Sequence, residues 1–214
     1  MMTYAVKECL RTLQGEGARS GRVAVLCRMS GCNLWSGQAA DQPAAACSFC
    51  DTDFVGTDGP GGGNFEAEAL ADQIERMWRS QLLEPFGVPY VVFTGGEPLL
   101  QLDRDLVDAC HDRGFEVAIE TNGTLPCPPT VDWVCVSPKS TSDLMITRGH
   151  ELKLVYPQRG LSPKDFEHLQ FQHWFLQPMD GAQRQENTRA CVDYCLAHPR
   201  WRLSVQVHKI IGVR

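Results

Sequence analysis

The chain alternates short apolar runs with longer segments in which apolar residues recur at helical spacing. Seven runs predict buried or half-buried strands over residues 23–28, 90–94, 116–120, 133–136, 151–155, 174–177 and 203–208. Apolar stripes predict one helix over 66–82 and another around Leu106, each with its apolar face in the core. Six or seven strand–helix units fall short of the eight of a closed barrel. The sequence therefore predicts an α/β fold, an open partial (β/α)6-type barrel with parallel strands.

Residues 36–63 break this alternation. The stretch is rich in glycine and proline and ends in Gly61-Gly62-Gly63. A long segment without regular structure inside a compact domain is commonly functional, so we expect a loop-rich insertion beside a site. No repeat and no linker divides the sequence, which predicts a single domain over residues 1–214.

Composition narrows the class of protein. The 214 residues are 43% hydrophobic, enough for one large core, and no apolar stretch is long enough to cross a bilayer. The net charge of -6 argues against a nucleic acid partner. Residues 1–10 lack the apolar core of a signal peptide, which favours a cytoplasmic location. A chain that can build such a core does not need disulfides, so the ten cysteines are expected to be reduced.

Polar residues close many of the predicted strands. In parallel α/β folds the carboxyl ends of the strands meet at one edge, where ligands bind. Gln206 and His208 alternate with valines in the run 203–208, so we expect both to share the interior face of a strand. The ring at this edge is expected to contain Arg28, residues 94–97, 120–122 and 137–139, Lys153, residues 177–180, Gln206 and His208.

Three cysteines are distinguished by their spacing. Cys32, Cys47 and Cys50 form the pattern C-x14-C-x2-C, whose thiolates could hold three irons of a [4Fe-4S] cluster and leave the fourth iron open. Cys27 precedes them, and the four together also match a structural zinc site, so spacing alone leaves both metals open. Two glycines directly after the run 90–94 favour iron–sulfur, because they let a ligand approach bare backbone.

Further motifs match one family. They are Leu13-Gln14-Gly15-Glu16-Gly17, Gly31-Cys32-Asn33-Leu34-Trp35, Cys50-Asp51-Thr52, Gly95-Gly96-Glu97-Pro98, Glu120-Thr121-Asn122-Gly123, Ser137-Pro138-Lys139 and Gln177-Pro178-Met179-Asp180. With these motifs the chain resembles the radical S-adenosylmethionine enzymes and, among them, the 7-carboxy-7-deazaguanine synthase family. Most of the superfamily has a much shorter first spacing between the cysteines. The motifs span nearly the whole chain.

The resemblance implies a reaction and a set of site residues. A reduced [4Fe-4S] cluster on Cys32, Cys47 and Cys50 would cleave S-adenosylmethionine to a 5'-deoxyadenosyl radical. The radical would abstract hydrogen from 6-carboxy-5,6,7,8-tetrahydropterin, which would lose ammonia to give 7-carboxy-7-deazaguanine in queuosine and other 7-deazapurine biosynthesis. Thr52 would hold Mg2+. The resemblance places S-adenosylmethionine at Gly96, Glu97, Ser137, Pro138, Lys139, Gln177, Pro178, Met179 and Asp180, and the substrate at Leu13, Gln14, Gly15, Glu16, Arg28, Thr94, Glu120, His208 and Arg214.

Several of these residues also have ordinary structural explanations. Glu97 could cap the helix that follows it, and residues 51–53 could form a hydrogen-bonded turn. His208 could be a core histidine, and Lys139 and Gln177 could be surface or capping residues.

Two other functions stay open at this point. A glycyl-radical-enzyme activating protein belongs to the same superfamily, although such proteins have the shorter cysteine spacing and need a groove for a polypeptide. A zinc-stabilised binding module would use Cys27 with the other three cysteines. The family resemblance further implies an electron donor such as flavodoxin or ferredoxin, a homodimer, and a terminal carboxylate, here that of Arg214, that reaches the substrate.

Overall fold

The computed structural model describes residues 2–80, 83, 87–141 and 143–213. Within these residues one nine-stranded sheet has the order β3-β1-β2-β4-β5-β6-β7-β8-β9. The strands are β1 (Tyr4–Leu13), β2 (Val23–Met29), β3 (Gly63–Phe65), β4 (Tyr90–Gly95), β5 (Glu116–Thr121), β6 (Trp133–Val136), β7 (Arg148–Tyr156), β8 (Gln170–Pro178) and β9 (Arg202–Leu203). The α-helices are α1 (Ala67–Arg79), α2 (Arg104–His111), α3 (Arg184–Ala197) and α4 (Val207–Ile211), and the 3-10 helices are η1 (Gly17–Arg19), η2 (Gln42–Ala44), η3 (Pro98–Leu100) and η4 (Pro163–Phe166).

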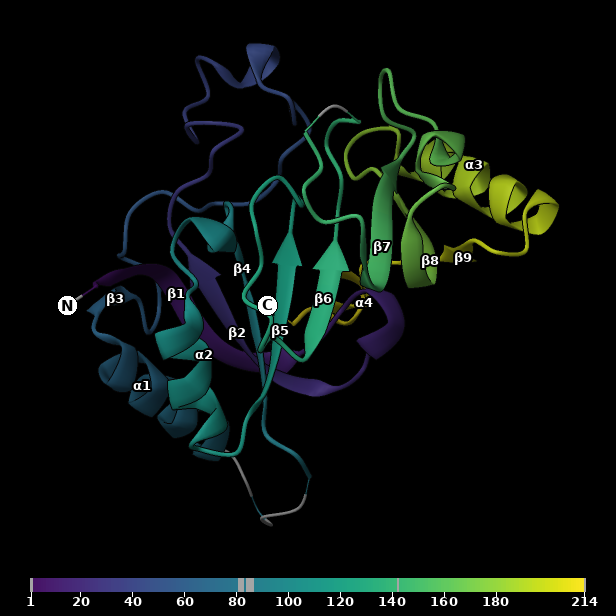
Figure 1. The fold of residues 1–214 in the computed structure, drawn as a ribbon. Coiled ribbons are helices and arrows are strands. Elements are labelled where there is room, and N and C mark those ends of the chain that lie inside the picture. The colour runs from purple at the N-terminus through teal and green to yellow at the C-terminus, as the bar shows by residue number, and fades with distance from the viewer. Residues whose placement is uncertain (1, 81–82, 84–86, 142, 214) are drawn as a thin grey trace.

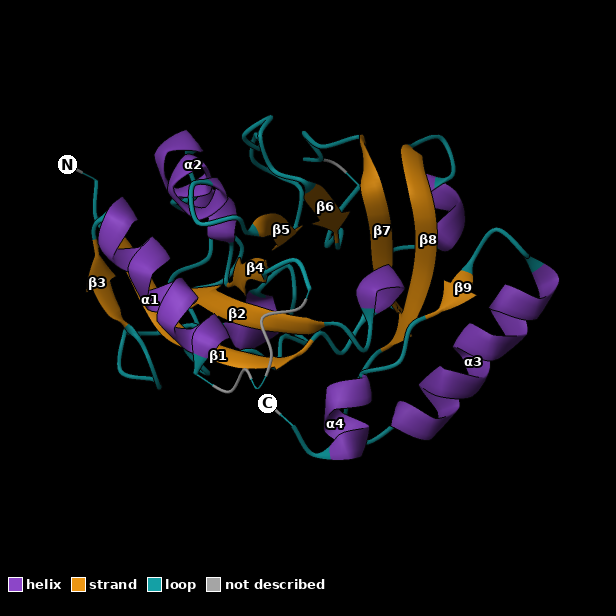
Figure 2. Cartoon of the chain, turned by 90° about the horizontal axis from the view of Figure 1, so that it is seen from below, coloured by secondary structure: helices purple, strands orange, loops and turns teal. Residues whose placement is uncertain are grey.

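The strands form an open curved sheet. From β2 to β9 each strand is parallel to its neighbour, whereas β1 is antiparallel to β2 and to β3. Figure 1 shows α1 and α2 at one end of the sheet and α3 at the other, and Figure 2 shows the strands following an open arc from β3 to β9. The predicted open partial barrel is confirmed. β1 and β3 were not predicted, and they add antiparallel pairing at one edge.

Helices cover fewer crossovers than predicted. α2 joins β4 to β5, and η4 and α3 flank β8. The β5–β6 connection and the described residues between β6 and β7 contain no helix. α1 ends at Arg79, and residues 81 and 82 of the predicted helix lie outside the described residues. The predicted loop over 36–63 is largely irregular, with η2 as its one helical turn in the described structure.

The pleat of the sheet separates an apolar outer face from a polar inner face. Val91 and Phe93 pack in the cluster that includes α1 and α2, whereas Val92 packs in a small inner cluster. Leu152 of β7 packs outward in the cluster that includes α3, which leaves its neighbour Lys153 on the inner face. Within the described residues no helix is both long and apolar enough to span a membrane.

Candidate active site

Two partly buried carboxylates inside the barrel share one lysine. Lys153 on β7 places Nζ 2.5 Å from Glu16 Oε2 and 3.1 Å from Glu120 Oε2. Gln206 Nε2 donates to Glu16 Oε1 over 3.0 Å, and Gln14 Nε2 donates to Glu120 Oε1 over 2.9 Å. The predicted substrate residues Gln14, Glu16 and Glu120 therefore lie together, although Gln14 and Glu16 follow β1 and Glu120 lies within β5.

Charge outweighs burial in this network. The Lys153 side chain is only 3% exposed. Burial acts to lower the pKa of Lys153, but Glu120 and Glu16 raise it well above its ordinary value. Burial also opposes ionisation of Glu16, yet Lys153 holds the pKa of Glu16 below its ordinary value. The interior thus contains an ammonium flanked by two carboxylates, which suits a polar ligand rich in N–H groups.

The amino-terminal end of the barrel is filled by side chains. The Arg19 guanidinium lies 4.1 Å from the ring centroid of Trp133, and its Nη2 lies 2.6 Å from Glu116 Oε1. Glu151 Oε2 accepts a hydrogen bond from Ala18 N over 3.0 Å, and burial raises the pKa of Glu151. A small cavity lies between these side chains and the carboxylate network. Its lining consists of Gln14, Glu16, Arg19, Tyr90, Val92, Ala118, Ile119, Glu120, Trp133, Cys135 and Glu151.

Arg28 and Thr94 face each other across neighbouring strands. They are register partners in the parallel pair of β2 and β4. Arg28 Nε donates to Glu8 Oε1 over 2.9 Å, so one edge of the guanidinium is already paired within the protein. The terminal nitrogens of the planar fork are the groups that would meet a ligand carboxylate.

The predicted strand over 203–208 is wrong for most of its length. Only Arg202–Leu203 pair with β8, while Gln206 occupies the position directly before α4 and His208 lies within that helix. Val207 N donates to Gly15 O over 2.9 Å, so the chain turns toward the end of β1 instead of extending the sheet. His208 packs against Gly15, where an added Cβ would lie 2.0 Å from Nδ1. Arg214 lies outside the described residues.

Cys32, Cys47 and Cys50 form a group. Cys50 N donates to Cys47 O over 3.0 Å, and a hydrogen bond between the thiols lowers the pKa of Cys50 to about 6. The Cys32 thiol is within electrostatic reach of Cys50 and of Glu97. Among the described residues no three His, Cys, Asp or Glu side chains converge on one metal-ion position. Thiolates that each bind a different iron need no such point, so this donor set fits a [4Fe-4S] cluster with one open iron.

Cys27 takes no part in that group. It is fully buried on β2, in the core cluster that also contains Cys9 and Cys110, and its Sγ lies 3.9 Å from Met29 Sδ. Contact with the Cys9 thiol and burial raise the pKa of Cys27 well above its ordinary value, which makes it a neutral core thiol. The four-cysteine zinc site considered from the sequence is therefore wrong.

Gly95 and Gly96 are required by the protein's own backbone. A Cβ at Gly95 would lie 2.2 Å from Met29 O, and one at Gly96 would lie 2.0 Å from Gly31 O. The glycines therefore let the loop that carries Cys32 rest directly on the end of β4. In this structure the close approach predicted for a ligand is made by the chain itself.

The Glu97 side chain is fully buried and is hydrogen-bonded within the protein. Its Oε1 accepts from Leu99 N over 2.9 Å and from Thr121 Oγ1 over 2.7 Å, and its Oε2 accepts from Asn122 N over 2.8 Å. Burial raises the pKa of Glu97. The side chain therefore caps η3, which is the structural role considered for it from the sequence. It also connects the end of β4 to the end of β5.

Comparison with known proteins agrees with this arrangement. The model of the Radical SAM superfamily matches residues 44–155. The chain is 60% identical to the 7-carboxy-7-deazaguanine synthase of Bordetella pertussis, covering 99% of this chain and 100% of that protein. It is 58% identical to the 7-carboxy-7-deazaguanine synthase of Bradyrhizobium diazoefficiens, covering 100% of both chains.

The chain belongs to the 7-carboxy-7-deazaguanine synthase family. The crystal structure of QueE from Escherichia coli matches with a TM-score of 0.68 at 27% identity, covering 96% of this chain and 95% of that one. Membership of the family makes the chain a lyase of the radical S-adenosylmethionine type, which implies a [4Fe-4S] cluster and S-adenosylmethionine. Family membership supports the 7-carboxy-7-deazaguanine synthase function over a glycyl-radical-enzyme activating protein and over a zinc-stabilised binding module.

Most of the remaining family motifs follow the carboxyl ends of the parallel strands, whereas Leu13 pairs with Val23 at the start of β2. Lys139 Nζ donates to Ser137 Oγ over 2.9 Å, and burial lowers the pKa of Lys139. Gln177 Oε1 accepts from Ser204 Oγ over 3.2 Å. The other members are Leu13, which ends β1, Thr52, whose backbone bonds to Cys50, Pro138 after β6, Pro178, which ends β8, and Met179, which follows it.

Lys209 connects two of these motifs. Its Nζ lies 2.5 Å from Asp180 Oδ2, after β8, and 2.6 Å from Asp51 Oδ2, next to Cys50. α4 therefore joins the loop of the cysteine group to the far end of the sheet. This contact was not predictable from the motifs, because Lys209 stands outside every one of them.

Other contributors were missed for a related reason. Lys153 was placed in the polar ring but given no role, although a lysine inside an apolar strand is a usable signal. Asn122 Nδ2 donates to Asn33 Oδ1 over 3.0 Å, which links the β5 motif to the Cys32 motif. Neither asparagine was assigned a role from the sequence.

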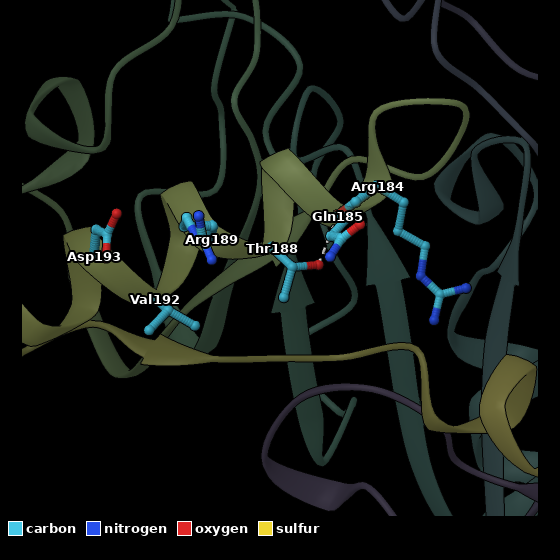
Figure 3. A pocket seen from close by; sticks show the side chains of 6 residues that line it. All are labelled: Arg184, Gln185, Thr188, Arg189, Val192 and Asp193. Atoms are coloured by element: carbon cyan, nitrogen blue, oxygen red, sulfur yellow. Dashed lines mark hydrogen bonds between the residues drawn. The ribbon is translucent and has the colours of Figure 1, made fainter.

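Pocket shape alone does not locate the site. Figure 3 shows a groove along the outer side of α3, where the Thr188 hydroxyl donates to the carbonyl of Arg184 over 2.7 Å. Its lining consists of Arg184, Gln185, Thr188, Arg189, Val192 and Asp193. In the part of the chain that the structure describes, no predicted site residue lines this groove.

Proposed function

We propose that this chain converts 6-carboxy-5,6,7,8-tetrahydropterin to 7-carboxy-7-deazaguanine and ammonia. The observation that carries the proposal is the carboxylate pair of Glu16 and Glu120, held by buried Lys153 inside the same barrel that carries the cysteine group. A pterin presents adjacent N–H donors, and carboxylates accept such pairs well. The names of the full-length relatives support the same reaction.

The thiolates of Cys32, Cys47 and Cys50 are proposed to hold the [4Fe-4S] cluster. With S-adenosylmethionine bound, the cluster supplies the radical chemistry, and the chain positions the reacting atoms. Because the Glu97 carboxylate is used within the protein, we assign recognition of the methionine ammonium to backbone oxygens of Gly96 and Glu97. The other proposed contacts of S-adenosylmethionine are Ser137, Pro138, Lys139, Gln177, Pro178, Met179 and Asp180.

The substrate is proposed to lie across the barrel interior. Glu16 and Glu120 accept its N–H groups, and the free edge of the Arg28 guanidinium binds its carboxylate. The remaining proposed substrate contacts are Leu13, Gln14, Gly15, Thr94, His208 and the terminal carboxylate of Arg214. The proposal further includes a single domain over residues 1–214, a homodimer, and a flavodoxin or ferredoxin as electron donor.

The test is anaerobic incubation of reconstituted protein with S-adenosylmethionine, reductant and the carboxytetrahydropterin. We expect a deazapurine absorbance together with 5'-deoxyadenosine and ammonia. Glu120→Gln is expected to retain the cluster and S-adenosylmethionine binding while losing substrate affinity. A loaded wild-type protein that cleaves S-adenosylmethionine but leaves the pterin unchanged would refute the proposed reaction.

Thr52 is the proposed protein ligand of Mg2+, whose preference is for oxygen donors. It directly follows Asp51 beside the cysteine group, and the ion would bridge this loop to the substrate carboxylate. Chelation and Thr52→Ala are each expected to slow turnover, with the iron content unchanged. Turnover that ignores both would exclude an essential Mg2+ at this position.

A further inference from the structure

Lys153 lies between the carboxylates of Glu16 and Glu120. Its Nζ contacts Glu16 Oε2 and Glu120 Oε2, and the second oxygen of each carboxylate accepts from an amide N–H of Gln206 or Gln14. All four contacts come from N–H donors. Each of these four oxygens is used as an acceptor, which is the role of an ionised carboxylate, and the adjacent ammonium favours that form.

Ionisation restricts the chemistry of the pocket. An ionised carboxylate only accepts hydrogen bonds, whereas a protonated one also donates. A 2-amino-4-oxopyrimidine edge offers N–H groups from its exocyclic amine and its ring nitrogen. A 2,4-dioxo edge replaces that amine with a carbonyl oxygen, which would place lone pairs against the lone pairs of Glu16 or Glu120.

We propose that Lys153 is a specificity-determining residue, because it fixes Glu16 and Glu120 as acceptors and so selects 2-amino-4-oxo pterins over 2,4-dioxo pteridines. The inference rests on the proposed function, since it takes a bicyclic pterin as the ligand of this interior. Lys153 acts here through the two carboxylates and needs no contact with the substrate.

Loss of the ammonium changes the carboxylates. Without Lys153 the two neighbouring, partly buried carboxylates repel each other, and this repulsion favours uptake of a proton by one of them. Its O–H then donates to the carbonyl of a dioxo ligand, which becomes a matched ligand. Glu151 and Cys135 also face Lys153, and neither supplies a positive charge. Lys139 is within electrostatic reach of Glu16 and Lys153, and His208 is within reach of Glu16; both are unchanged in every variant, so wild type and variants are compared at one pH.

The experiment measures binding rather than turnover. Pterin-6-carboxylate and lumazine-6-carboxylate are fluorescent, unreactive probes that differ in the group at position 2. They are titrated against anaerobic holoenzyme with S-adenosylmethionine. A site built for an N–H group strongly rejects an analogue that lacks it, so we expect wild type to prefer the pterin by at least about 100-fold. Lys153→Met is expected to reduce this preference by at least about tenfold, because one protonated carboxyl is enough to donate a hydrogen bond to the carbonyl oxygen.

A second pair of variants decides the question if Lys153→Met fails to fold. Lys153→Arg retains a positive charge beside Glu16 and Glu120 and is expected to keep most of the preference. Lys153→Gln retains a hydrogen-bond donor but removes the charge, and it is expected to lose the preference relative to Lys153→Arg.

The outcomes separate the two proposals. If removal of the Lys153 charge leaves the pterin preference unchanged, the inference is overturned and the proposed function stands. If wild type binds S-adenosylmethionine but neither probe, the proposed function itself fails. A lower preference in the forms without a positive charge at residue 153 supports the inference.

Discussion

Gly96→Ala tests whether the contact between β4 and the Cys32 loop positions the cluster ligand. A Cβ at residue 96 would lie 2.0 Å from Gly31 O and 2.9 Å from the Cys32 Cβ. Real Cβ contacts essentially never fall below 3.0 Å, so in a close-packed interior the loop must move by about 1 Å. That movement also disrupts the 2.9 Å hydrogen bond from Glu97 N to Gly31 O.

The cost can be worked from these contacts. Overpacking of this kind costs about 1–3 kcal/mol, and a lost backbone hydrogen bond adds about 1 kcal/mol, so the total is about 2–4 kcal/mol. A domain with about 5–15 kcal/mol of stability survives such a loss. The variant should therefore fold with Cys32 displaced from Cys47 and Cys50. Its iron content after anaerobic reconstitution should fall well below that of wild type.

The assay combines iron and sulfide analysis with urea unfolding of the apo chain. Gly114→Ala is the matched control, because Gly114 has φ +77° and an added Cβ would meet nothing within 4 Å. It should lose about 1–2 kcal/mol through backbone strain and keep a full cluster. Wild-type iron content and wild-type stability in Gly96→Ala would refute the reasoning.

Three further outcomes are expected. By iron analysis, Cys27→Ala should keep the cluster and Cys47→Ala should lose it; the reverse result would contradict the ligand assignment. Glu97→Gln should cost the apo chain about 1–3 kcal/mol, because its amide would face N–H donors, and an unchanged urea midpoint would contradict the capping role. Lys209 lowers the pKa of Asp180, so the ion pair stabilises the folded chain only while Asp180 is ionised. Lys209→Met should therefore be less thermally stable than wild type at neutral pH, and this difference should vanish as pH falls through the lowered pKa of Asp180. A loss independent of pH would contradict the pairing.

The strands that carry the site were predictable because each is a short apolar run closed by polar residues. β4 and β5 extend only one residue beyond the predicted runs 90–94 and 116–120. Alternation along these strands then places Thr94 and Glu120 on the inner face. The fold class and much of the polar ring therefore follow from local patterns.

β1 was not predictable in the same way. Its register against β2 shifts between Val6 and Glu8, so its alternation of inner and outer residues is interrupted. Lys7 and Arg11 add charges that an apolar-run criterion rejects. Its neighbour β3 has only three residues, too few to give a period-two signal.

The pairing of charged side chains inside the site could not be predicted from local sequence patterns either. Lys153 is 137 residues from Glu16 and 33 residues from Glu120 along the chain. The sequence identifies a lysine and several carboxylates at one edge, but their pairing depends on the curvature that brings β7 opposite the end of β1. Glu97 illustrates the same point, because its role depends on donors from η3 and from the end of β5.

The misassigned end of the chain explains how an open sheet encloses its interior. β9 pairs with β8 alone, so a longer strand there would have continued along β8, away from β1. The chain instead turns into α4, and the bond from Val207 N to Gly15 O carries it to the end of β1. Gln206 thereby reaches Glu16, and His208 fits because residue 15 has no side chain. The absence of a side chain at Gly15 thus allows the end of the chain to close the interior through a backbone contact and not through strand pairing.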